Sequence, residues 1–130
     1  MNAHATFREA VDARDLAAIL ARFREDAILY SPVSFKPFEG KHAISHLIGI
    51  LLEVFDEFRY TDELASADGH TVGLVFRARV GTRDVEGLDL LRFDAEGKVC
   101  ELTVMVRPRS ALEALFAAVA ARLGATGGSA

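Results

Sequence analysis

The segment that decides the fold runs from residue 71 to residue 106 and reads TVGLVFRARVGTRDVEGLDLLRFDAEGKVCELTVMV. Apolar and polar residues alternate along it with a period of two, which is the pattern of half-buried β-strands. Turn signals at Gly81-Thr82 and Ala95-Glu96-Gly97, with an earlier one at Asp68-Gly69, divide the chain from residue 58 onward into four strands. We therefore predict an antiparallel meander.

The two faces of this meander differ in character. One phase is apolar along all three later strands except for Asp89, and it includes Cys100 as a small buried thiol. The other phase mixes Arg77, Arg107 and Glu101 with leucine and methionine. We expect the first phase to face a core or cavity and the second to form the interface of a homodimer.

Helices are predicted before and after the run of strands in the sequence. Two short helices open the chain, the second extending to Phe23 with Asp15 as its N-cap. A strand over residues 27–31 ends at Pro32, and a third helix starts near Lys41. A final helix follows the last strand, begins with a capping box over residues 110–113 and stops at Gly124.

This order of elements indicates an α+β fold, a curved antiparallel sheet closed by the N-terminal helices, with an extra C-terminal helix. Residues 1–123 are expected to form a single domain and residues 124–130 a flexible tail.

Composition excludes several classes of function. The 130 residues contain 15 Lys plus Arg against 19 Asp plus Glu, a formal net charge of −4, which argues against a nucleic-acid partner. Hydrophobic residues make up 51%, enough for one substantial core. The apolar stretches are too short for a membrane span, and the N-terminus lacks the pattern of a secretory signal, so we expect a cytoplasmic protein.

Three motifs carry a resemblance to a known family: DAILYSP at residues 26–32, FEGKHAI at 38–44 and GLDLLRFDAEGKV at 87–99. Over about residues 7–106 the chain resembles the nuclear-transport-factor-2-like superfamily, and the SnoaL-like and ketosteroid-isomerase-like branches most of all. The resemblance implies a cone of sheet closed by three helices around a hydrophobic pocket, commonly in a homodimer. Such motifs specify the fold better than the reaction.

The polar groups of the isomerase branch are mostly replaced in this sequence. Its general-base carboxylate falls on Ser31, its oxyanion-hole tyrosine on Phe7 and its supporting tyrosine on Ile48, and only its oxyanion-hole aspartate has a match, at Asp89. A serine hydroxyl does not take up a proton near neutral pH unaided. We therefore predict no ketosteroid isomerase activity.

Asp89 is the candidate catalytic residue. Among apolar neighbours its pKa should rise and favour the neutral acid, which can donate a hydrogen bond, as in ketosteroid isomerase. The alternative is a structural aspartate paired with a buried hydroxyl or an arginine. Ser31 is either a pocket hydroxyl or a turn former, and Tyr60 with Asp62 is a second polar pair if their strand phase faces inward.

Other reactive side chains point to no further chemistry. His42 and His46 share one helix face but have no third metal ligand in sequence, and Cys100 has no cationic neighbour on its strand phase to activate it. The chain also has no glycine-rich phosphate loop. We expect no metal and no cofactor.

The favoured function is the binding of a small apolar, cyclic or aromatic molecule. Whether the protein also catalyses a reaction is left open at this point; the resemblance implies that an enzyme of this kind would be an isomerase, cyclase or dehydratase that uses Asp89 as acid. One alternative is a dimerisation or scaffold domain whose cavity is filled by its own Phe7, Phe35, Phe55, Phe76 and Phe93. Another is a substrate-carrying accessory domain of a larger assembly. The predicted pocket consists of Phe7, Leu29, Ser31, Phe35, Ile48, Phe55, Tyr60, Leu74, Phe76, Leu91, Leu102 and Val104.

Overall fold

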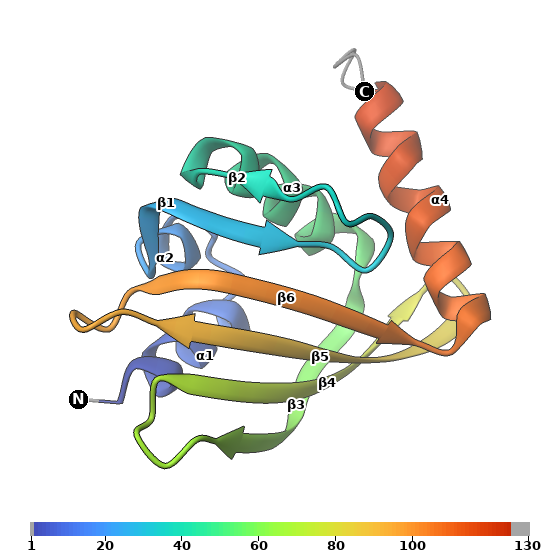
Figure 1. Ribbon diagram of the computed structural model, residues 1–130. Coiled ribbons are helices and arrows are strands. Elements are labelled where there is room, and N and C mark those ends of the chain that lie inside the picture. Colours follow the sequence, from blue (N-terminus) through green and yellow to red (C-terminus); the bar gives the residue numbers. More distant parts are fainter. Residues whose placement is uncertain (1, 126–130) are drawn as a thin grey trace.

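The computed structural model describes residues 2–125 as four helices and six strands (Figure 1). In chain order they are α1 (Ala3–Asp12), α2 (Leu16–Leu20), β1 (Phe23–Tyr30), β2 (Phe38–Glu39), α3 (Lys41–Val54), β3 (Asp56–Ala65), β4 (Thr71–Val80), β5 (Arg83–Phe93), β6 (Val99–Arg107) and α4 (Arg109–Ala125).

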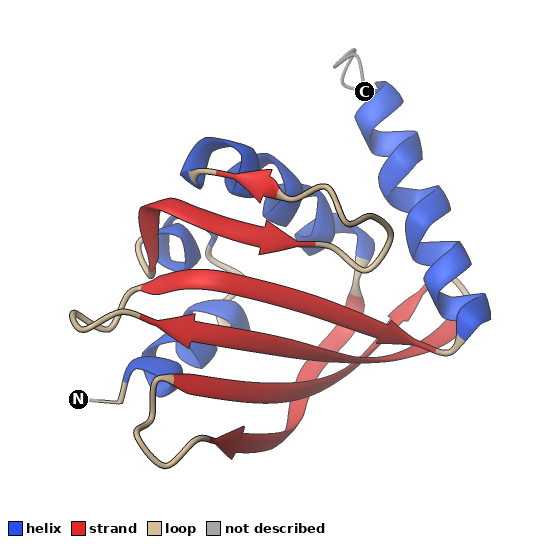
Figure 2. Cartoon of the chain, in the orientation of Figure 1, coloured by secondary structure: helices blue, strands red, loops and turns tan. Residues whose placement is uncertain are grey.

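The six strands form one curved sheet in the order β2-β1-β6-β5-β4-β3. Strands β3 to β6 pair with their sequence neighbours as the predicted antiparallel meander. The pairing of β1 with β6 is parallel, so the sheet is mixed, and β2 and β3 are its free edges. The α+β class is confirmed: in Figure 2 the N-terminal helices lie behind the sheet and the C-terminal helix stands at one end.

The apolar strand phase faces the helices, as predicted. Along β4 and β5 burial alternates, and Leu74, Phe76 and Leu91 are at most 1% exposed. The pattern shifts at one point on β6: Arg92 pairs with Glu101 but Phe93 pairs with Val99, which leaves a β-bulge between them. The bulge buries Val99 and leaves Cys100 only half-buried, so Cys100 is not the buried thiol that was predicted.

The N-terminal boundaries differ in one respect from the sequence prediction. Asp15 is the N-cap of α2, and its carboxylate accepts a hydrogen bond from the Ala18 amide at 3.1 Å, as expected. However, α2 ends at Leu20 and Phe23 begins β1. An apolar residue at helical spacing is also compatible with the buried face of a following strand, which is how Phe23 is used.

Helix α4 packs against the sheet and α3 through small and aliphatic side chains. Ala111 and Leu115 are buried, whereas Phe116 is 56% exposed. The helix begins at Arg109, whose guanidinium pairs with Glu113 at 3.2 Å, so the predicted capping box does not form. The helix includes Gly124, which therefore does not end it; residues 126–130 of the expected tail lie outside the described residues.

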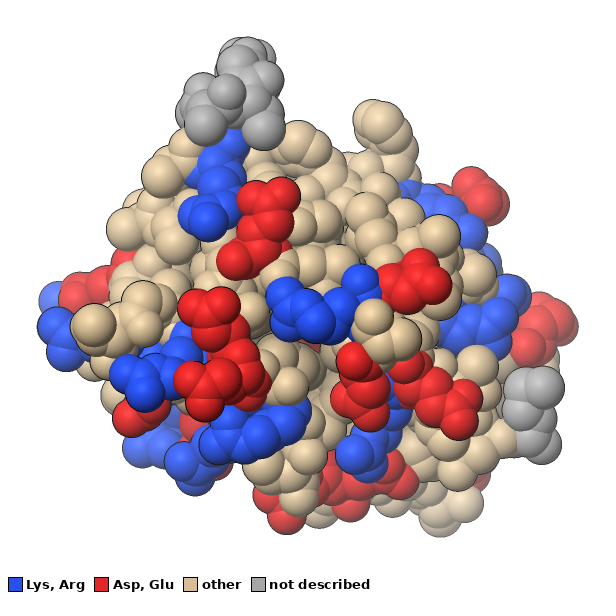
Figure 3. All heavy atoms as spheres, turned by 180° about the vertical axis from the view of Figure 1, so that it is seen from behind, with Lys and Arg blue, Asp and Glu red and all other residues tan. Residues whose placement is uncertain are grey.

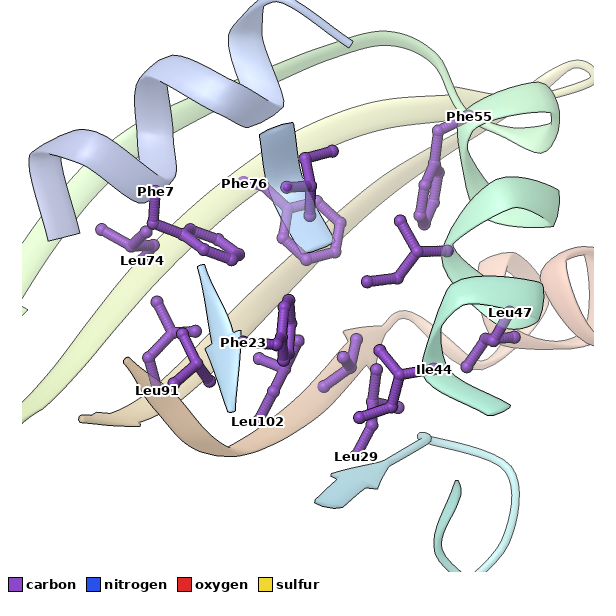
Figure 4. Packing of buried hydrophobic residues seen from close by; sticks show 14 of the residues in the cluster. Phe7, Phe23, Leu29, Ile44, Leu47, Phe55, Leu74, Phe76, Leu91 and Leu102 are labelled. Carbon is purple, nitrogen blue, oxygen red and sulfur yellow. The ribbon is translucent and has the colours of Figure 1, made fainter. Parts of the chain in front are cut away.

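The core lies between the inner face of the sheet and the helices, and Figure 4 shows its side chains converging from both layers. Aromatic rings form its centre: Phe76 stacks on Phe58 with ring centroids 4.8 Å apart and meets Phe55 edge-on at 5.6 Å. Within residues 2–125 the helices are all too short or too polar to cross a bilayer.

Candidate active site

A cavity of about 80 Å³ lies between the sheet and helices α1, α2 and α3. Its wall is almost wholly apolar and aromatic, with Tyr60 and Asp89 at one side and Arg14 at another. The partly exposed lining residues on α1 and α3 place its mouth between these two helices. It is lined by Phe7, Val11, Arg14, Ile19, Leu29, Ile48, Leu51, Leu52, Phe55, Phe58, Tyr60, Phe76, Asp89, Leu102 and Val104.

Asp89 and Tyr60 are joined across two strands that are not neighbours in the sheet. Asp89 lies on β5 opposite Leu74 of β4, and Tyr60 lies on β3 opposite Phe76 of β4. The Tyr60 hydroxyl donates a hydrogen bond of 2.7 Å to Asp89 Oδ2. Among the described residues Asp89 Oδ1 has no hydrogen-bond partner, and Asp89 is one of the residues that line the cavity.

Burial decides the acidity of both groups. Asp89 is only 8% exposed, and the loss of hydration raises its pKa to about 6, although the hydrogen bond from Tyr60 acts in the opposite direction. Burial also raises the pKa of Tyr60 well above its usual value, and the adjacent Asp89 carboxylate adds to this effect. Tyr60 therefore remains a hydrogen-bond donor while Asp89 exchanges its proton close to neutral pH.

Asp89 is paired with a tyrosine hydroxyl, that of Tyr60, which is the pairing expected for a structural aspartate, and Asp62 does not join them. A register shift on β3 separates Tyr60 from Asp62: Tyr60 pairs with Phe76, but Asp62 pairs with Val75 on the opposite phase. Asp62 is consequently exposed and accepts a hydrogen bond from Thr61 at 3.0 Å. The expected pair of Tyr60 and Asp62 is thus not formed.

Helix α1 is tied to β3 by an ionic cluster beside Tyr60. The guanidinium of Arg8 lies 5.6 Å from the centre of the Tyr60 ring and 2.9 Å from Glu63 Oε1. His4 Nε2 lies 2.5 Å from the other oxygen of Glu63. These contacts link α1 to β3 beside the tyrosine that lines the cavity.

Four predicted pocket residues lie outside this cavity. Leu74 and Leu91 are completely buried in the core and do not line the cavity. Phe35 is 99% exposed on the loop between β1 and β2 and lines the second hollow described below, so it does not fill the cavity that holds Asp89. The other eight predicted pocket residues, together with Asp89, line the cavity between the sheet and helices α1, α2 and α3.

Ser31 lines a second hollow of about 570 Å³ between the loop after β1 and the end of β6. Its Oγ is buried and has no hydrogen-bond partner among the described residues. Val104 lines both spaces, whereas Ser31 lines only the second and Asp89 only the first. The structure therefore does not bring Ser31 and Asp89 together in one cavity.

The sequence prediction did not include six lining residues. Val11, Leu51 and Phe58 lie at the helical or strand spacing already recognised, so their periodicity was a usable signal. Arg14 gave no such signal, because it lies in the turn between α1 and α2 and only the three-dimensional arrangement brings it to the cavity mouth. The remaining two are Ile19 and Leu52.

The histidines of α3 lie away from the cavity: His42 and His46 are both exposed. Among residues 2–125 no group of three or more His, Cys, Asp or Glu side chains is arranged to hold a metal ion.

Comparison with known proteins agrees with this architecture. A mixed curved sheet with three helices over an apolar cavity defines the nuclear-transport-factor-2-like class. The family model described as "SnoaL-like domain" matches residues 4–102, and the chain belongs to this family. None of the functionally curated proteins matches it.

Two solved structures are similar in sequence as well as in fold. A structure described as a steroid delta-isomerase from Pseudomonas aeruginosa is 40% identical, with 98% of this chain and 96% of that chain covered and a TM-score of 0.91. An uncharacterised bacterial protein with a cystatin-like fold from Silicibacter pomeroyi is 30% identical, covering 93% and 84% of the two chains, with a TM-score of 0.87.

A third structure, described as a putative SnoaL-like polyketide cyclase from Shewanella denitrificans, shares the fold at 14% identity. It covers 88% of this chain and 95% of that chain, with a TM-score of 0.67.

Proposed function

We propose that the cavity binds a small, mainly apolar organic molecule and that Asp89 transfers a proton to or from it. The observation that carries this proposal is the arrangement of Asp89, whose Oδ2 is held by Tyr60 while Oδ1 has no partner among the described residues, in a cavity whose other lining side chains are apolar except for Arg14. Apolar walls with very few polar groups are the usual form of small-molecule sites, and perturbed carboxyls are enriched in them.

The chemistry follows from the acidity of Asp89. With a pKa of about 6, the carboxyl is present in both protonation states near neutral pH. The neutral acid donates a proton to a carbonyl, epoxide or hydroxyl oxygen, and the resulting carboxylate takes a proton from carbon or oxygen. Such a cycle serves isomerisation, cyclisation or dehydration and uses only the chain's own carboxyl, so the proposal requires no cofactor or metal.

The similar proteins support this class of reaction. One is described as a steroid delta-isomerase and another as a putative polyketide cyclase. We do not extend steroid isomerisation to this chain, because Ser31 stands where that activity uses a carboxylate base and lies outside the cavity of Asp89.

The size of the cavity limits the ligand. Sites for drug-sized molecules usually occupy about 300 Å³ or more, whereas this cavity occupies about 80 Å³. The ligand is therefore a molecule of a few heavy atoms, or one end of a larger molecule that extends through the mouth between α1 and α3.

The same volume favours a second candidate, a non-catalytic scaffold or dimerisation domain. The rings of Phe7, Phe55, Phe58 and Phe76 occupy much of the space between sheet and helices. A scaffold domain would keep this core filled. The buried carboxyl of Asp89 argues against this candidate, because ionisation of a buried group lowers the stability of the fold and a scaffold does not need one.

For the partners, we propose a homodimer through the outer face of β4, β5 and β6. This face carries the ion pairs of Glu86 with Arg77 and Arg107 beside Met105, which is 48% exposed. We propose no nucleic-acid or membrane partner and a cytosolic location. On the face of the molecule drawn in Figure 3, acidic and basic side chains are interleaved, which is unlike a phosphate-binding surface.

Native mass spectrometry of the freshly purified protein tests the proposal, with denaturation to identify any released compound. We expect a dimer that carries an apolar organic molecule, and loss of that molecule in Asp89→Asn but not in Asp84→Asn, an exposed control on the same strand. In parallel, NMR titration with cyclohexanone should shift resonances of Tyr60 and Phe76. Absence of both an adduct and these shifts would contradict ligand binding and favour the scaffold.

A further inference from the structure

We propose that Arg14 makes the cavity selective for apolar molecules that carry a carboxylate, with the anionic group held at the mouth and the apolar part directed toward Asp89. The inference rests on the proposed ligand-binding function. It starts from the observation that Arg14 is the one cationic side chain among the fifteen residues that line the cavity.

The backbone fixes Arg14 at this position. It lies in the turn between α1 and α2 with φ of 54°, in the left-handed region that non-glycine residues seldom adopt. Its amide donates to the carbonyl of Val11 at 2.9 Å, which closes the turn. The side chain consequently projects from a defined point of the turn toward the end of α3, where Leu51 and Leu52 also line the cavity.

The charge of Arg14 has no carboxylate partner among the described residues. Its guanidinium donates one hydrogen bond, to the carbonyl oxygen of Leu52. The acidic residues closest in sequence do not pair with it, and Asp15 instead accepts from the Ala18 amide. By contrast, Arg8 and Arg122 each pair with a glutamate. A guanidinium carries five N–H donors in a planar fork that matches a carboxylate.

The two charged groups of the cavity also set the orientation of a ligand. The ionised form of Asp89 repels a carboxylate, whereas the guanidinium of Arg14 attracts it. An apolar acid therefore enters with its uncharged part toward Asp89 and Tyr60. Any group that reacts with Asp89 then lies at the end of the ligand opposite to the carboxylate.

A purely structural role for Arg14 predicts a different result. Arginine often binds the unpaired carbonyls in the last turn of a helix, and Leu52 lies in the last turn of α3. Loss of that bond would lower the stability of the protein. It would weaken charged and uncharged ligands equally, so the dependence of affinity on ligand charge separates the two roles.

The test compares phenylacetate with phenylacetamide, which have the same shape but differ in charge. Heteronuclear NMR titrations measure both dissociation constants for the full chain and for Arg14→Gln and Arg14→Lys. Arg59→Gln is the matched control, because Arg59 also donates one bond to a backbone carbonyl, that of Glu57, and lies outside the cavity. The unfolding midpoint of each variant reports any structural effect.

We expect the unmodified protein to bind phenylacetate about tenfold more tightly than phenylacetamide, a typical gain for a charge-assisted hydrogen bond. Arg14→Gln should abolish this preference and leave the affinity for the amide unchanged, Arg14→Lys should retain part of it, and Arg59→Gln should retain all of it. If the unmodified protein binds phenylacetate and phenylacetamide with equal affinity and both shift the resonances of cavity residues, the role of Arg14 is overturned but ligand binding is not. Absence of cavity shifts with either compound at millimolar concentration would overturn both.

Discussion

The hydroxyl of Tyr60 lies 2.7 Å from Oδ2 of Asp89 and donates a hydrogen bond to it from a strand two positions away in the sheet. Among the described residues that line the cavity, this bond joins the two strand residues with polar side chains. It occupies one oxygen of the carboxyl and stabilises the ionised form. Tyr60 therefore lowers the pKa of Asp89, which burial alone would raise further, and leaves Oδ1 as the oxygen without a hydrogen-bond partner among the described residues.

The first prediction concerns this tuning. Replacement of Tyr60 by phenylalanine removes a hydrogen bond that favours the carboxylate, so the pKa of Asp89 should rise further above about 6. Carbon-detected NMR of the side-chain carboxyl across a pH series measures this value directly. Tyr30→Phe, which changes the other tyrosine of the chain, should leave it unchanged. An Asp89 pKa that stays constant or falls in Tyr60→Phe would contradict the assignment.

The second prediction concerns the stability of the fold as a function of pH. The pKa of Asp89 is raised from 3.8 to about 6 in the folded protein, so the folded state retains its proton where the unfolded chain has lost it. The resulting stability is fully present below about pH 4 and is lost as the pH rises through about 6. At about 1.4 kcal/mol for each pKa unit, the loss amounts to about 3 kcal/mol.

Asp89→Asn should therefore gain stability relative to the unmodified protein as the pH rises from about 4, with the gain levelling off above about pH 7. Asparagine retains an acceptor for Tyr60 but does not ionise. Urea unfolding at a series of pH values measures the difference. Asp84→Asn, on the exposed side of the same strand, serves as control. A difference between Asp89→Asn and the unmodified protein that is independent of pH would show that Asp89 titrates alike in both states.

Strand periodicity predicts most of this site because it is a local property. Alternation alone places Phe76, Asp89 and Leu102 on the inner face, and the structure has them there. It fails where the register changes. Bulges after Tyr60 and at Cys100 each insert one residue, which moves the following side chains to the other face.

Contacts between distant segments are the part that the sequence does not reveal. Tyr60 and Asp89 are 29 positions apart, and neither their hydrogen bond nor the approach of Arg14 to α3 follows from the period of any single element. The parallel pairing of β1 with β6 is likewise a property of the assembled sheet. These features depend on how the layers are packed, and they are the features that define the chemistry of the cavity.

The third prediction concerns substrate. The unmodified protein should not accelerate isomerisation of a Δ5-3-ketosteroid, although a similar structure is described as a steroid delta-isomerase. Ser31 supplies no carboxylate base, its Oγ lies in a hollow separate from Asp89, and a cavity of about 80 Å³ does not enclose a steroid. Ultraviolet absorbance of the conjugated product measures the rate. A rate above that of buffer, lost in Asp89→Asn, would contradict this expectation.

The last prediction concerns the shape of the cavity wall. A methyl group added at Gly87 of β5 would collide with the ring of Phe76 and lie 2.8 Å from the carbonyl oxygen of Met105. The ring lines the cavity and the carbonyl belongs to the neighbouring strand, so neither yields easily. Gly87→Ala should lower the free energy of unfolding by about 1–3 kcal/mol, as overpacked substitutions do. Gly49→Ala is the control, because its methyl group meets only Leu16 at 3.7 Å inside a helix, where alanine is favoured over glycine by up to about 1 kcal/mol. Urea unfolding that finds both variants equally stable would show that Phe76 has room to move, and that the cavity of about 80 Å³ is able to change its shape around a ligand.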